Sequence, residues 1–369
     1  MSDLTPEQSA HVKQLSAKMI GLKLHAGFHH VEPGPVVTGY FFATGGNTPV
    51  AKYLRHNVDF ALAVGASEVL VQREGTFIVI YVPNKQRTIV DYKNYLSWYL
   101  HDETTQKMKI PIPLGLNSKG NMSAFDLTEA PHVLIAGSTG SGKSVYKSAI
   151  ICSLAYNFAP ERMVLHLVDT KKVDFPLFSS LPCIQNVVTE VLDFHVLMQQ
   201  LDTEIDRRLK VLQGSSCRNI QDYHAMGLQL PYIVIIMDEV ADLIMRDAAL
   251  RESGAFDGFP SVAESIRKIA QIGRAPGVHL IIGTQRPSVK VIKGDIKTNL
   301  PTRIALRLPT AADSITVLGS GGAEYLLGQG DMLVQLSNES NLQRFHGPFV
   351  SLNDITQMVG DFEMLYGRI

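Results

Sequence analysis

One short motif constrains this chain of 369 residues more than any other stretch: a glycine-rich loop that begins at Gly137. The pattern G-x-x-x-x-G-K-[ST] is completed by Gly142, Lys143 and Ser144. An apolar run over 133–136 precedes the loop and a plausible helix over 144–156 follows it, and the motif works only between a strand and a helix. A flexible Gly/Ser linker, the alternative, would not occupy that position. The motif therefore predicts an α/β domain organised around a phosphate-binding loop.

The residue types of this loop indicate its chemistry. Glycines allow backbone N–H groups to curl around a phosphate, and the start of the following helix adds positive potential. Lys143 would reach the β and γ phosphates, and the Ser144 hydroxyl would bind Mg²⁺. The residues expected to contact the nucleotide are Gly137, Ser138, Thr139, Gly140, Ser141, Gly142, Lys143, Ser144 and Val145. The sequence thus predicts a site for a nucleoside triphosphate and its magnesium ion.

Composition excludes several other classes of protein. The formal net charge is −1, so any nucleic-acid contact needs a local basic patch. The three cysteines, Cys152, Cys183 and Cys217, have neither metal-ligand spacing nor the pattern of a disulfide framework. Apolar runs are shorter than the ~20 residues that span a bilayer, and the N-terminus lacks the apolar core of a signal peptide. We therefore expect a soluble, cytoplasmic protein of about two domains.

The residues before the loop predict a small α/β module with no catalytic constellation of its own. Expected helices cover 3–23, 50–64 and 91–100, and expected strands cover 36–42, 68–73 and 76–82, the last two as a hairpin. Its basic residues are scattered, which favours ordinary solvated surface over a second nucleic-acid site. Residues 101–131 are charged and then rich in Pro, Gly and Asn, so we interpret them as a connector. The expected domains are 1–108 and 109–369.

Beyond the connector, strands and helices alternate, which favours a mostly parallel sheet covered by helices. The expected strands cover 133–136, 163–168, 232–237, 279–283, 303–308 and 331–335. The expected helices cover 144–156, 190–212, 261–272, 289–299 and 311–318.

Two carboxylates, Asp238 and Glu239, end the most apolar of these strands, IVIIMDE. Ligands bind at this carboxyl edge in open α/β sheets. Asp238 is expected to hold Mg²⁺ through water, and Glu239 to polarise the attacking water as a general base. A helix cap is the alternative for a strand-end Asp-Glu pair. With the phosphate loop upstream, the pair favours a RecA-like NTPase that hydrolyses its nucleotide.

Two further residues, Gln285 and Arg274, are candidates for contact with a nucleotide. Gln285 comes directly after the strand LIIG and could contact the γ-phosphate, although a polar turn residue is the alternative. Arg274 stands in a tight Gly/Pro loop before that strand, where it is poorly placed for its own phosphate loop. It could reach the nucleotide of a neighbouring subunit as an arginine finger, or it could cap a helix C-terminus.

A basic segment follows Gln285, with Asp295 as its only acid. Three lysines spaced three and four apart share one face of a helix, which could bind a phosphate backbone without sequence preference or could be a solvated face. The candidate DNA contacts are Arg286, Lys290, Lys293, Lys297 and Arg303.

Taken together, these residues make the chain closely resemble the motor of the FtsK/SpoIIIE family of DNA translocases. The matching stretches are AGSTGSGKSV, IVIIMDEVADLI, GRAPGVHLIIGTQRPSV, IKTNLPTRIAL and LLGQGDML. GPVVTGYFF and VPNKQRTIV resemble the family's α domain, and residues from about 110 to 350 resemble its RecA-like β domain. The resemblance implies a homo-hexameric ring that threads double-stranded DNA and moves along it with ATP hydrolysis.

The resemblance also implies a role for each matching residue. Lys143, Ser144, Asp238 and Glu239 would form the ATPase centre, with Arg274 acting in trans and Gln285 as the sensor. Arg286 and Lys297 fall in segments that face the family's central channel.

Some features depart from the family. No segment matches its membrane-spanning region, long linker or winged-helix module, so we expect no membrane partner and no sequence-directed loading. The segment after Asp238–Glu239, RDAALRESGAFDGFPS, looks longer than usual for the family and is expected to be a surface loop. Ala312 and Ile315 stand where family members commonly carry basic, DNA-facing residues.

Two alternative functions remain: a related ATPase that moves protein, and a nucleotide-gated DNA clamp.

Overall fold

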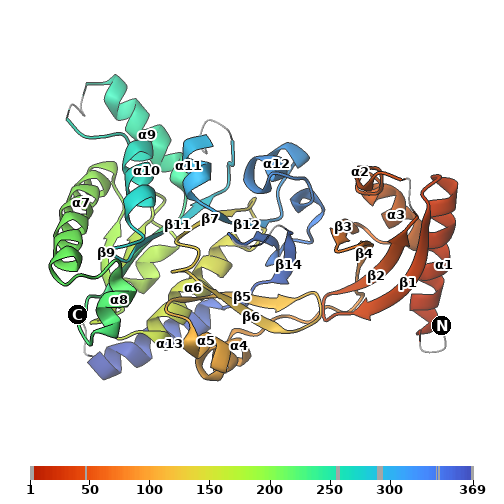
Figure 1. Ribbon diagram of the computed structural model, residues 1–369, viewed down its shortest axis with the longest axis horizontal. Helices are drawn as coiled ribbons and strands as arrows, with labels where there is room; N and C mark the ends of the chain where they lie inside the picture. Colours follow the sequence, from red (N-terminus) through yellow and green to blue (C-terminus); the bar gives the residue numbers. More distant parts are fainter. Residues whose placement is uncertain are drawn as a thin grey trace.

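The computed structural model describes residues 4–45, 48–254, 258–288, 294–337, 339 and 341–366. It shows two lobes side by side along the long axis of the molecule, a small one formed by the N-terminal residues at the right and a larger one at the left (Figure 1). Each lobe is built on its own sheet.

The small lobe holds a four-stranded antiparallel sheet in the order β1-β2-β4-β3. Its elements are α1 (Pro6–Gly21), β1 (Ala26–Pro33), β2 (Val37–Thr44), α2 (Val50–Tyr53), α3 (Asn57–Val64), β3 (Leu70–Glu74) and β4 (Phe77–Pro83). The hairpin predicted around residues 74–75 is confirmed as β3–β4, and Thr5 caps α1 in a reciprocal capping box with Gln8. The helix predicted over 50–64 is wrong in its middle, because the chain leaves helical geometry at 54–56, and β1 was not predicted.

The large lobe holds a ten-stranded sheet in the order β6-β5-β14-β13-β12-β7-β11-β10-β8-β9. Its strands are β5 (Pro111–Asn117), β6 (Met122–Asp126), β7 (His132–Ala136), β8 (Met163–Val168), β9 (Ile184–Val188), β10 (Tyr232–Met237), β11 (Val278–Thr284), β12 (Thr302–Leu306), β13 (Asp331–Gln335) and β14 (Gln343–His346). The six strands from β12 to β9 pair in parallel, which confirms the predicted mostly parallel sheet.

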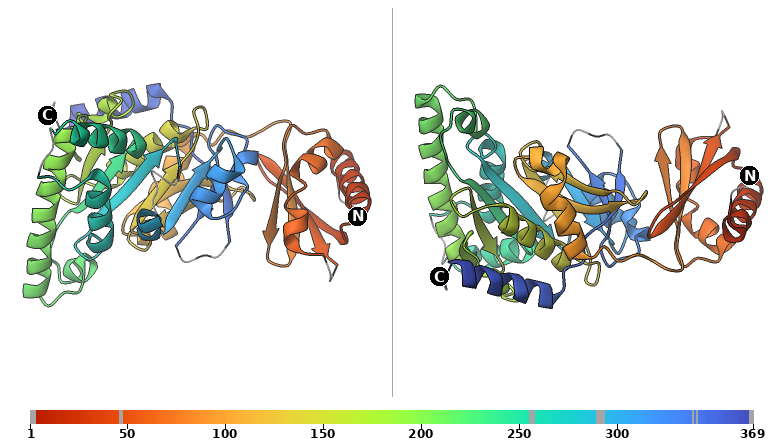
Figure 2. Two further views of the ribbon diagram at one scale, coloured as in Figure 1. Left: turned by 90° about the horizontal axis from the view of Figure 1, so that it is seen from above. Right: turned by 90° about the horizontal axis from the view of Figure 1, so that it is seen from below.

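Helices cover both faces of this sheet (Figure 2). They are α4 (Tyr92–His101), α5 (Glu103–Lys107), α6 (Lys143–Asn157), α7 (Val191–Gly214), α8 (Ile220–Ala225), α9 (Val240–Glu252), α10 (Val262–Ile272), α11 (Gly294–Asn299), α12 (Ala311–Leu318) and α13 (Leu352–Tyr366), with short 3₁₀ turns η1 (Phe175–Phe178) and η2 (Ala323–Tyr325). Alternate residues of β10 enter different cores: Ile235 packs on the side of α7, α9 and α10, and Ile236 on the side of α6 and α13. Because β10 is buried on both faces, all of its residues are apolar, which explains the continuous apolar run in the sequence.

The interpretation of residues 101–131 as a connector is wrong. They form α5 and the β5–β6 hairpin, which extends the large sheet, and Ile112 and Leu114 lie in its core. Gly115 has a φ of +88°, and a Cβ there would lie 1.9 Å from the carbonyl oxygen of His346 on β14. The glycine that suggested a loop is instead required by close backbone contact between paired strands. The domain boundary near residue 108 stays a prediction.

The segment after Glu239 also differs from the expected surface loop. Helix α9 continues to Glu252, and the buried Asp247 accepts hydrogen bonds from His195, Arg251 and the backbone N–H of Val262. Residues 255–257 of this stretch lie outside the described part of the chain.

The two lobes share one hydrophobic core. Phe41 and Val79 of the small sheet belong to the same cluster as Leu333 of β13. The Arg307 guanidinium also contacts the Glu68 carboxylate at 2.7 Å, which adds an ion pair between the lobes. Across the described residues, no helix has both the length and the apolar character that a bilayer crossing requires.

Candidate active site

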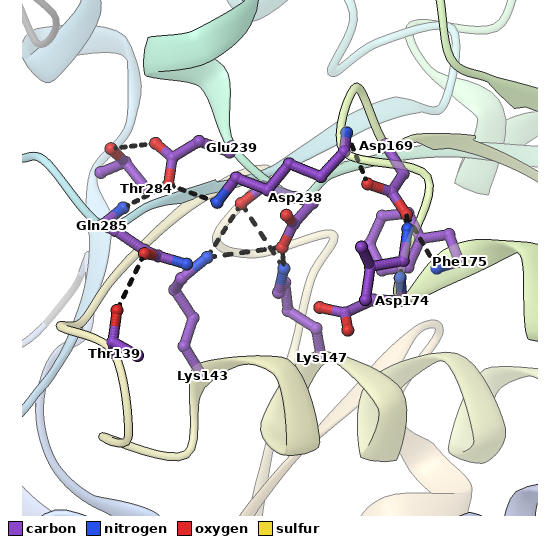
Figure 3. Close-up of polar contacts among 12 residues, drawn as sticks. Thr139, Lys143, Lys147, Asp169, Asp174, Phe175, Asp238, Glu239, Thr284 and Gln285 are labelled. Carbon is purple, nitrogen blue, oxygen red and sulfur yellow. Dashed lines mark hydrogen bonds and ion pairs between the residues drawn. The ribbon is translucent and has the colours of Figure 1, made fainter.

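Three loops meet at the carboxyl edge of the parallel strands. The glycine-rich loop follows β7, Asp238 and Glu239 follow β10, and Gln285 follows β11. Because β7 pairs with β11, and β11 with β10, their carboxyl ends are neighbours. Figure 3 shows Lys143, Asp238, Glu239 and Gln285 converging there.

The glycine-rich loop has a conformation that needs its glycines. Gly140 and Gly142 have φ values of +79° and +97°. A Cβ on Gly142 would lie 2.5 Å from the backbone nitrogen of Gly330, so the chain of the 328–330 turn passes directly against the loop. Ser141 contributes to this contact because its carbonyl accepts the N–H of Gly330 at 2.9 Å. The loop is therefore fixed in shape on one side and open on the other, as a phosphate cradle must be.

Hydrogen bonds to the end of β11 and to the residue after β12 anchor the start of the loop. The Gly137 N–H donates to the carbonyl of Thr284, and the N–H and hydroxyl of Ser138 both donate to the carbonyl of Arg307. Val145 and Ser144 follow on the first turn of α6, both partly buried.

Lys143 reaches across to the strand-end carboxylates. Its Nζ lies 3.0 Å from the carbonyl oxygen and 3.4 Å from Oδ1 of Asp238, and the residue is 3% exposed. Burial lowers the pKa of Lys143, and the negative charge of Glu239 opposes that shift. The ammonium is thus held at the mouth of the cradle where phosphates would bind.

Glu239 is held by hydrogen bonds from the last residue of β11 and from the residue that follows it. One oxygen accepts the Thr284 hydroxyl and the other accepts the backbone N–H of Gln285, both at 2.8 Å. The side-chain oxygen of Gln285 in turn accepts the Thr139 hydroxyl at 3.3 Å. A continuous polar chain therefore joins the glycine-rich loop, the proposed sensor and the proposed general base.

Lys147 is a site residue that sequence reasoning missed. It lies one turn after Lys143 on α6, is fully buried, and forms an ion pair with Oδ1 of Asp238 (Figure 3). The i, i+4 spacing from Lys143 is the signal that could have found it, since it places both ammonium groups on one helix face.

Asp169, at the end of β8, is a second missed residue. Its carboxylate accepts the backbone N–H groups of the five residues from Lys171 to Phe175. This shapes the loop that faces Asp238 and holds the Phe175 ring 5.1 Å from the Nζ of Lys147.

A cavity of about 490 Å³ opens beside the glycine-rich loop and was also not predicted. Gly140, Gly142, Val145 and Tyr146 form one wall. The other walls come from residues 87–90, 327–330 and 346–349, which are far apart in the sequence. Its size and position suit the base and ribose of a nucleotide whose phosphates lie in the loop.

Arg274 lies at the opposite edge of the sheet from these groups. It is exposed, and it precedes β11, whereas Gln285 follows β11. The strand spans about 20 Å at ~3.3 Å per residue, so Arg274 cannot reach the glycine-rich loop of its own chain.

The basic segment is only partly described. Arg286 is exposed directly after Gln285, while Lys290 and Lys293 lie outside the described residues. Lys297 donates to the carbonyl of Ile315 at 3.4 Å, and burial, then Arg303, lowers its pKa. The Arg303 guanidinium donates to the carbonyls of Lys297 and Leu300, so it closes the end of α11. Ala312 and Ile315 are exposed on the adjoining α12.

Comparison with known proteins places these features in context. The model of the FtsK/SpoIIIE family matches residues 99–227 and 223–289. The protein named DNA translocase FtsK from Staphylococcus epidermidis strain RP62A is 35% identical over 368 residues, covering 96% of this chain and 44% of the relative. That of Helicobacter pylori strain 26695 is 35% identical over 359 residues, covering 94% and 40%. The chain thus spans less than half the length of these curated relatives.

Solved structures show the same fold. The conjugation coupling protein TcpA of pCW3, in a monomer form with ATPγS, aligns with a TM-score of 0.65 at 23% identity over 96% of this chain and 99% of that chain. The cytoplasmic domain of the type VII secretion ATPase EccC from Thermomonospora curvata gives a TM-score of 0.58 at 26% identity, over 69% of this chain and 31% of that chain. The predicted RecA-like P-loop ATPase fold is therefore confirmed.

Proposed function

The chain belongs to the FtsK/SpoIIIE family, and on that premise we propose that it is an ATP-driven motor that moves along double-stranded DNA without reading its sequence. The relatives named DNA translocase FtsK support this proposal. The observation that carries it is the polar chain from Thr139 through Gln285 to Glu239, which links a phosphate cradle to a carboxylate aimed at its mouth.

The nucleotide fits the cradle and the adjoining cavity. ATP would place its phosphates against Gly140, Gly142 and Lys143, and its base and ribose in the cavity beside Tyr146. The ATPγS in the related TcpA structure supports this assignment.

The donor set also fits a magnesium ion. The Ser144 hydroxyl and the Asp238 carboxylate are hard oxygen donors at the same edge of the sheet, and these are the ligands that Mg²⁺ prefers. When bound, the ion would neutralise charge on the β and γ phosphates.

Hydrolysis would then depend on the residues around Glu239. Its carboxylate would accept a proton from the attacking water, while Thr284 and the N–H of Gln285 hold it in orientation. The Gln285 side chain would sense the γ-phosphate, and its contact with Thr139 ties that position to the glycine-rich loop.

The position of Arg274 supports the homo-hexameric ring that we propose. Because this exposed arginine and the glycine-rich loop lie at opposite edges of the sheet, head-to-tail packing would bring Arg274 of one subunit to the ATP of the next. Such heterologous contacts generate a ring when the rotation closes. Arg274 would then stabilise the transition-state charge in trans.

Movement would come from the basic segment after Gln285. Arg286 is two residues from the Glu239 partner Thr284, and its backbone N–H donates to the Thr284 hydroxyl at 3.1 Å. Loss of the γ-phosphate would shift this turn, and with it the grip of Arg286, Lys290, Lys293, Lys297 and Arg303 on DNA phosphates. Such binding would be independent of sequence and strongly salt-dependent. We place this activity in the cytoplasm.

The decisive experiment is displacement of a triplex-forming strand from linear duplex DNA, with and without ATP. A motor removes the third strand only when it hydrolyses ATP. Binding without displacement would indicate a nucleotide-gated clamp, and ATP turnover that ignores DNA would favour a protein-moving ATPase like the secretion relatives.

A further inference from the structure

A second lysine reaches the proposed general base from a loop outside the phosphate-loop motif. The Nζ of Lys171 lies 3.9 Å from Oε2 of Glu239, the oxygen that also accepts the backbone N–H of Gln285. That distance is an ion-pair contact and is too long for a hydrogen bond. Within the part of the chain that the structure describes, the Lys171 ammonium makes no hydrogen bond. Its three N–H donors are therefore available to an anion bound beside Glu239.

The sheet brings the loop of Lys171 to the site. This loop follows β8, and Val168 at the end of β8 pairs in parallel with Met237 at the end of β10. Parallel neighbours place their carboxyl ends at one edge of a sheet, so the loop after β8 opens beside Glu239. Figure 3 shows Asp169, the first residue of this loop, at the same edge as Glu239.

Contacts on both sides of Lys171 fix its backbone. Its N–H donates to Oδ1 of Asp169 at 3.1 Å, and the Thr170 hydroxyl donates to the Asp242 carboxylate on α9 at 2.5 Å. Lys172 has a φ of +60°, a left-handed conformation that is uncommon for residues other than glycine. Because the Lys171 side chain is 39% exposed, its ammonium can reorient while the backbone stays in place.

The Glu239 carboxylate does not depend on this ion pair. One of its oxygens accepts the Thr284 hydroxyl and the other accepts the N–H of Gln285, and both bonds remain if the ammonium of Lys171 turns away. The lysine can therefore leave the carboxylate for another anion without leaving a buried acceptor unsatisfied.

A γ-phosphate would be the nearest such anion. The attacking water must lie within hydrogen-bond reach of Glu239, about 3 Å, and about 3–3.5 Å from the γ-phosphorus. An ammonium 3.9 Å from Oε2 then needs only a small rotation of its exposed side chain to meet a γ-phosphate oxygen.

We propose that Lys171 is a further catalytic residue, whose ammonium donates a hydrogen bond to a γ-phosphate oxygen of bound ATP. In the hydrolytic step, the water oxygen bonds to the γ-phosphorus and its proton passes to Glu239. The bond from the γ-phosphorus to the bridging oxygen breaks, and that oxygen leaves with the electron pair on ADP. Lys171 stabilises the charge on the transferred phosphoryl group from within the subunit, whereas Arg274 would act from a neighbour.

The same contact would select the nucleotide. ADP has no γ-phosphate, so the Lys171 ammonium strengthens binding of the triphosphate alone. This inference rests on the proposed ATP site, but it requires neither DNA movement nor ring assembly.

The test compares the dissociation constants of ATPγS and ADP, measured by isothermal titration calorimetry in Mg²⁺ with the intact chain. Lys171→Met keeps the length of the side chain and removes its charge. The preference for ATPγS over ADP should fall by a factor of about five or more, and the affinity for ADP should stay within about twofold. The kcat of ATP turnover should fall about tenfold or more.

Two further variants control this result. Lys171→Arg keeps the positive charge and should retain most of the preference for ATPγS. Lys172→Met is the matched control, because the Lys172 ammonium pairs with Glu190 at 2.5 Å. Its preference for ATPγS and its kcat should both stay within about twofold of wild type.

An unchanged preference for ATPγS in Lys171→Met would overturn the proposal, even if turnover slowed. A lysine that only orients Glu239 would slow hydrolysis without selecting the γ-phosphate. Equal losses of preference in Lys171→Met and Lys171→Arg would also overturn it, since the charge would then not be responsible. Failure of the wild-type protein to bind either nucleotide would instead remove the proposed ATP site itself, a result distinct from ATPγS binding that ignores Lys171.

Discussion

The guanidinium of Arg208 on α7 donates a hydrogen bond to the carbonyl of Pro276, two residues after Arg274, at 3.0 Å. The same group donates to the carbonyl of Pro231 at 2.7 Å and contacts the Glu204 carboxylate at 2.7 Å. A buried side chain of one helix therefore fixes the loop that presents the proposed arginine finger. The exposed tip of that loop is held by contacts that lie entirely inside the subunit.

Arg208→Leu should lower the free energy of unfolding by about 3 kcal/mol, because the carbonyls of Pro231 and Pro276 lose a charged donor and Glu204 keeps only Arg207. Urea denaturation measures this loss. Arg207→Leu is the matched control: Arg207 contacts the same Glu204 but is 53% exposed, so its removal should cost less than about 0.5 kcal/mol. Equal losses in the two variants would contradict the role given to Arg208.

Glu239→Gln should lower ATP turnover by a factor of about 10² or more, because the amide cannot accept a proton from water. Nucleotide binding should persist, since the contacts to Thr284 and Gln285 tolerate an amide.

Lys143→Ala should also abolish ATP turnover. Undiminished turnover in Lys143→Ala would remove the assignment of the phosphate loop.

Arg274→Ala should abolish turnover while nucleotide binding is retained, because the missing charge acts on the neighbouring subunit's site. Mixing this variant with Glu239→Gln tests that geometry. In mixed rings, Glu239→Gln subunits supply Arg274 to sites that still have Glu239, so part of the activity should return. Mixed rings verified by mass spectrometry that stay inactive would contradict action in trans.

Charge reversal to Glu at Lys290, Lys293 and Lys297 should abolish DNA-stimulated ATP turnover and leave basal turnover in place. The loss follows from repulsion of DNA phosphates, and the slope of log affinity against log salt should fall by about 3. Reversal of Lys13, Lys52 and Lys85 on the small lobe is the control and should leave stimulation intact. A wild-type response in the first variant would exclude the channel assignment.

Acidification should destabilise the protein between pH 6.5 and about 4. Burial lowers the pKa of His166 to about 4, so the folded state binds fewer protons than the unfolded state in this window. The contribution of His166 to the free energy of unfolding is therefore fully present above pH 6.5. As the pH drops below that value, it falls by up to ~1.4 kcal/mol per pH unit. His166→Gln should flatten that decline in urea unfolding measured from pH 7.5 to 4.5, and an unchanged slope would assign the decline to other groups.

The sequence predicted those parts of the site whose signal is local. The glycine-rich loop, the strand-end pair Asp238–Glu239 and the position of Gln285 each follow from a few adjacent residues and from the edge rule for parallel sheets. The mostly parallel sheet followed from the alternation of apolar strands and helices, whereas the RecA-like assignment came from the Asp238–Glu239 pair beside the phosphate loop and from the family resemblance. The roles of these residues, and of Arg274 in trans, stay predictions.

What the sequence did not predict depends on contacts between distant segments. The spacing of Lys147 from Lys143 shows a shared helix face, but its contact with Asp238, 91 positions later, appears only in the folded chain. Gly115 suggested a loop because its reason for being glycine, the carbonyl of His346, lies on another strand. Periodicity describes one element at a time, so neither pairing was visible in it.

Residues 87–90, which leave the small sheet, form part of the wall of the cavity beside the glycine-rich loop. The large lobe alone consequently does not supply every wall of this cavity. A gene fusion that transferred the ATPase sheet alone would deliver a nucleotide pocket with one side missing. The cavity beside the glycine-rich loop is therefore enclosed only when the segment that follows the small sheet is present.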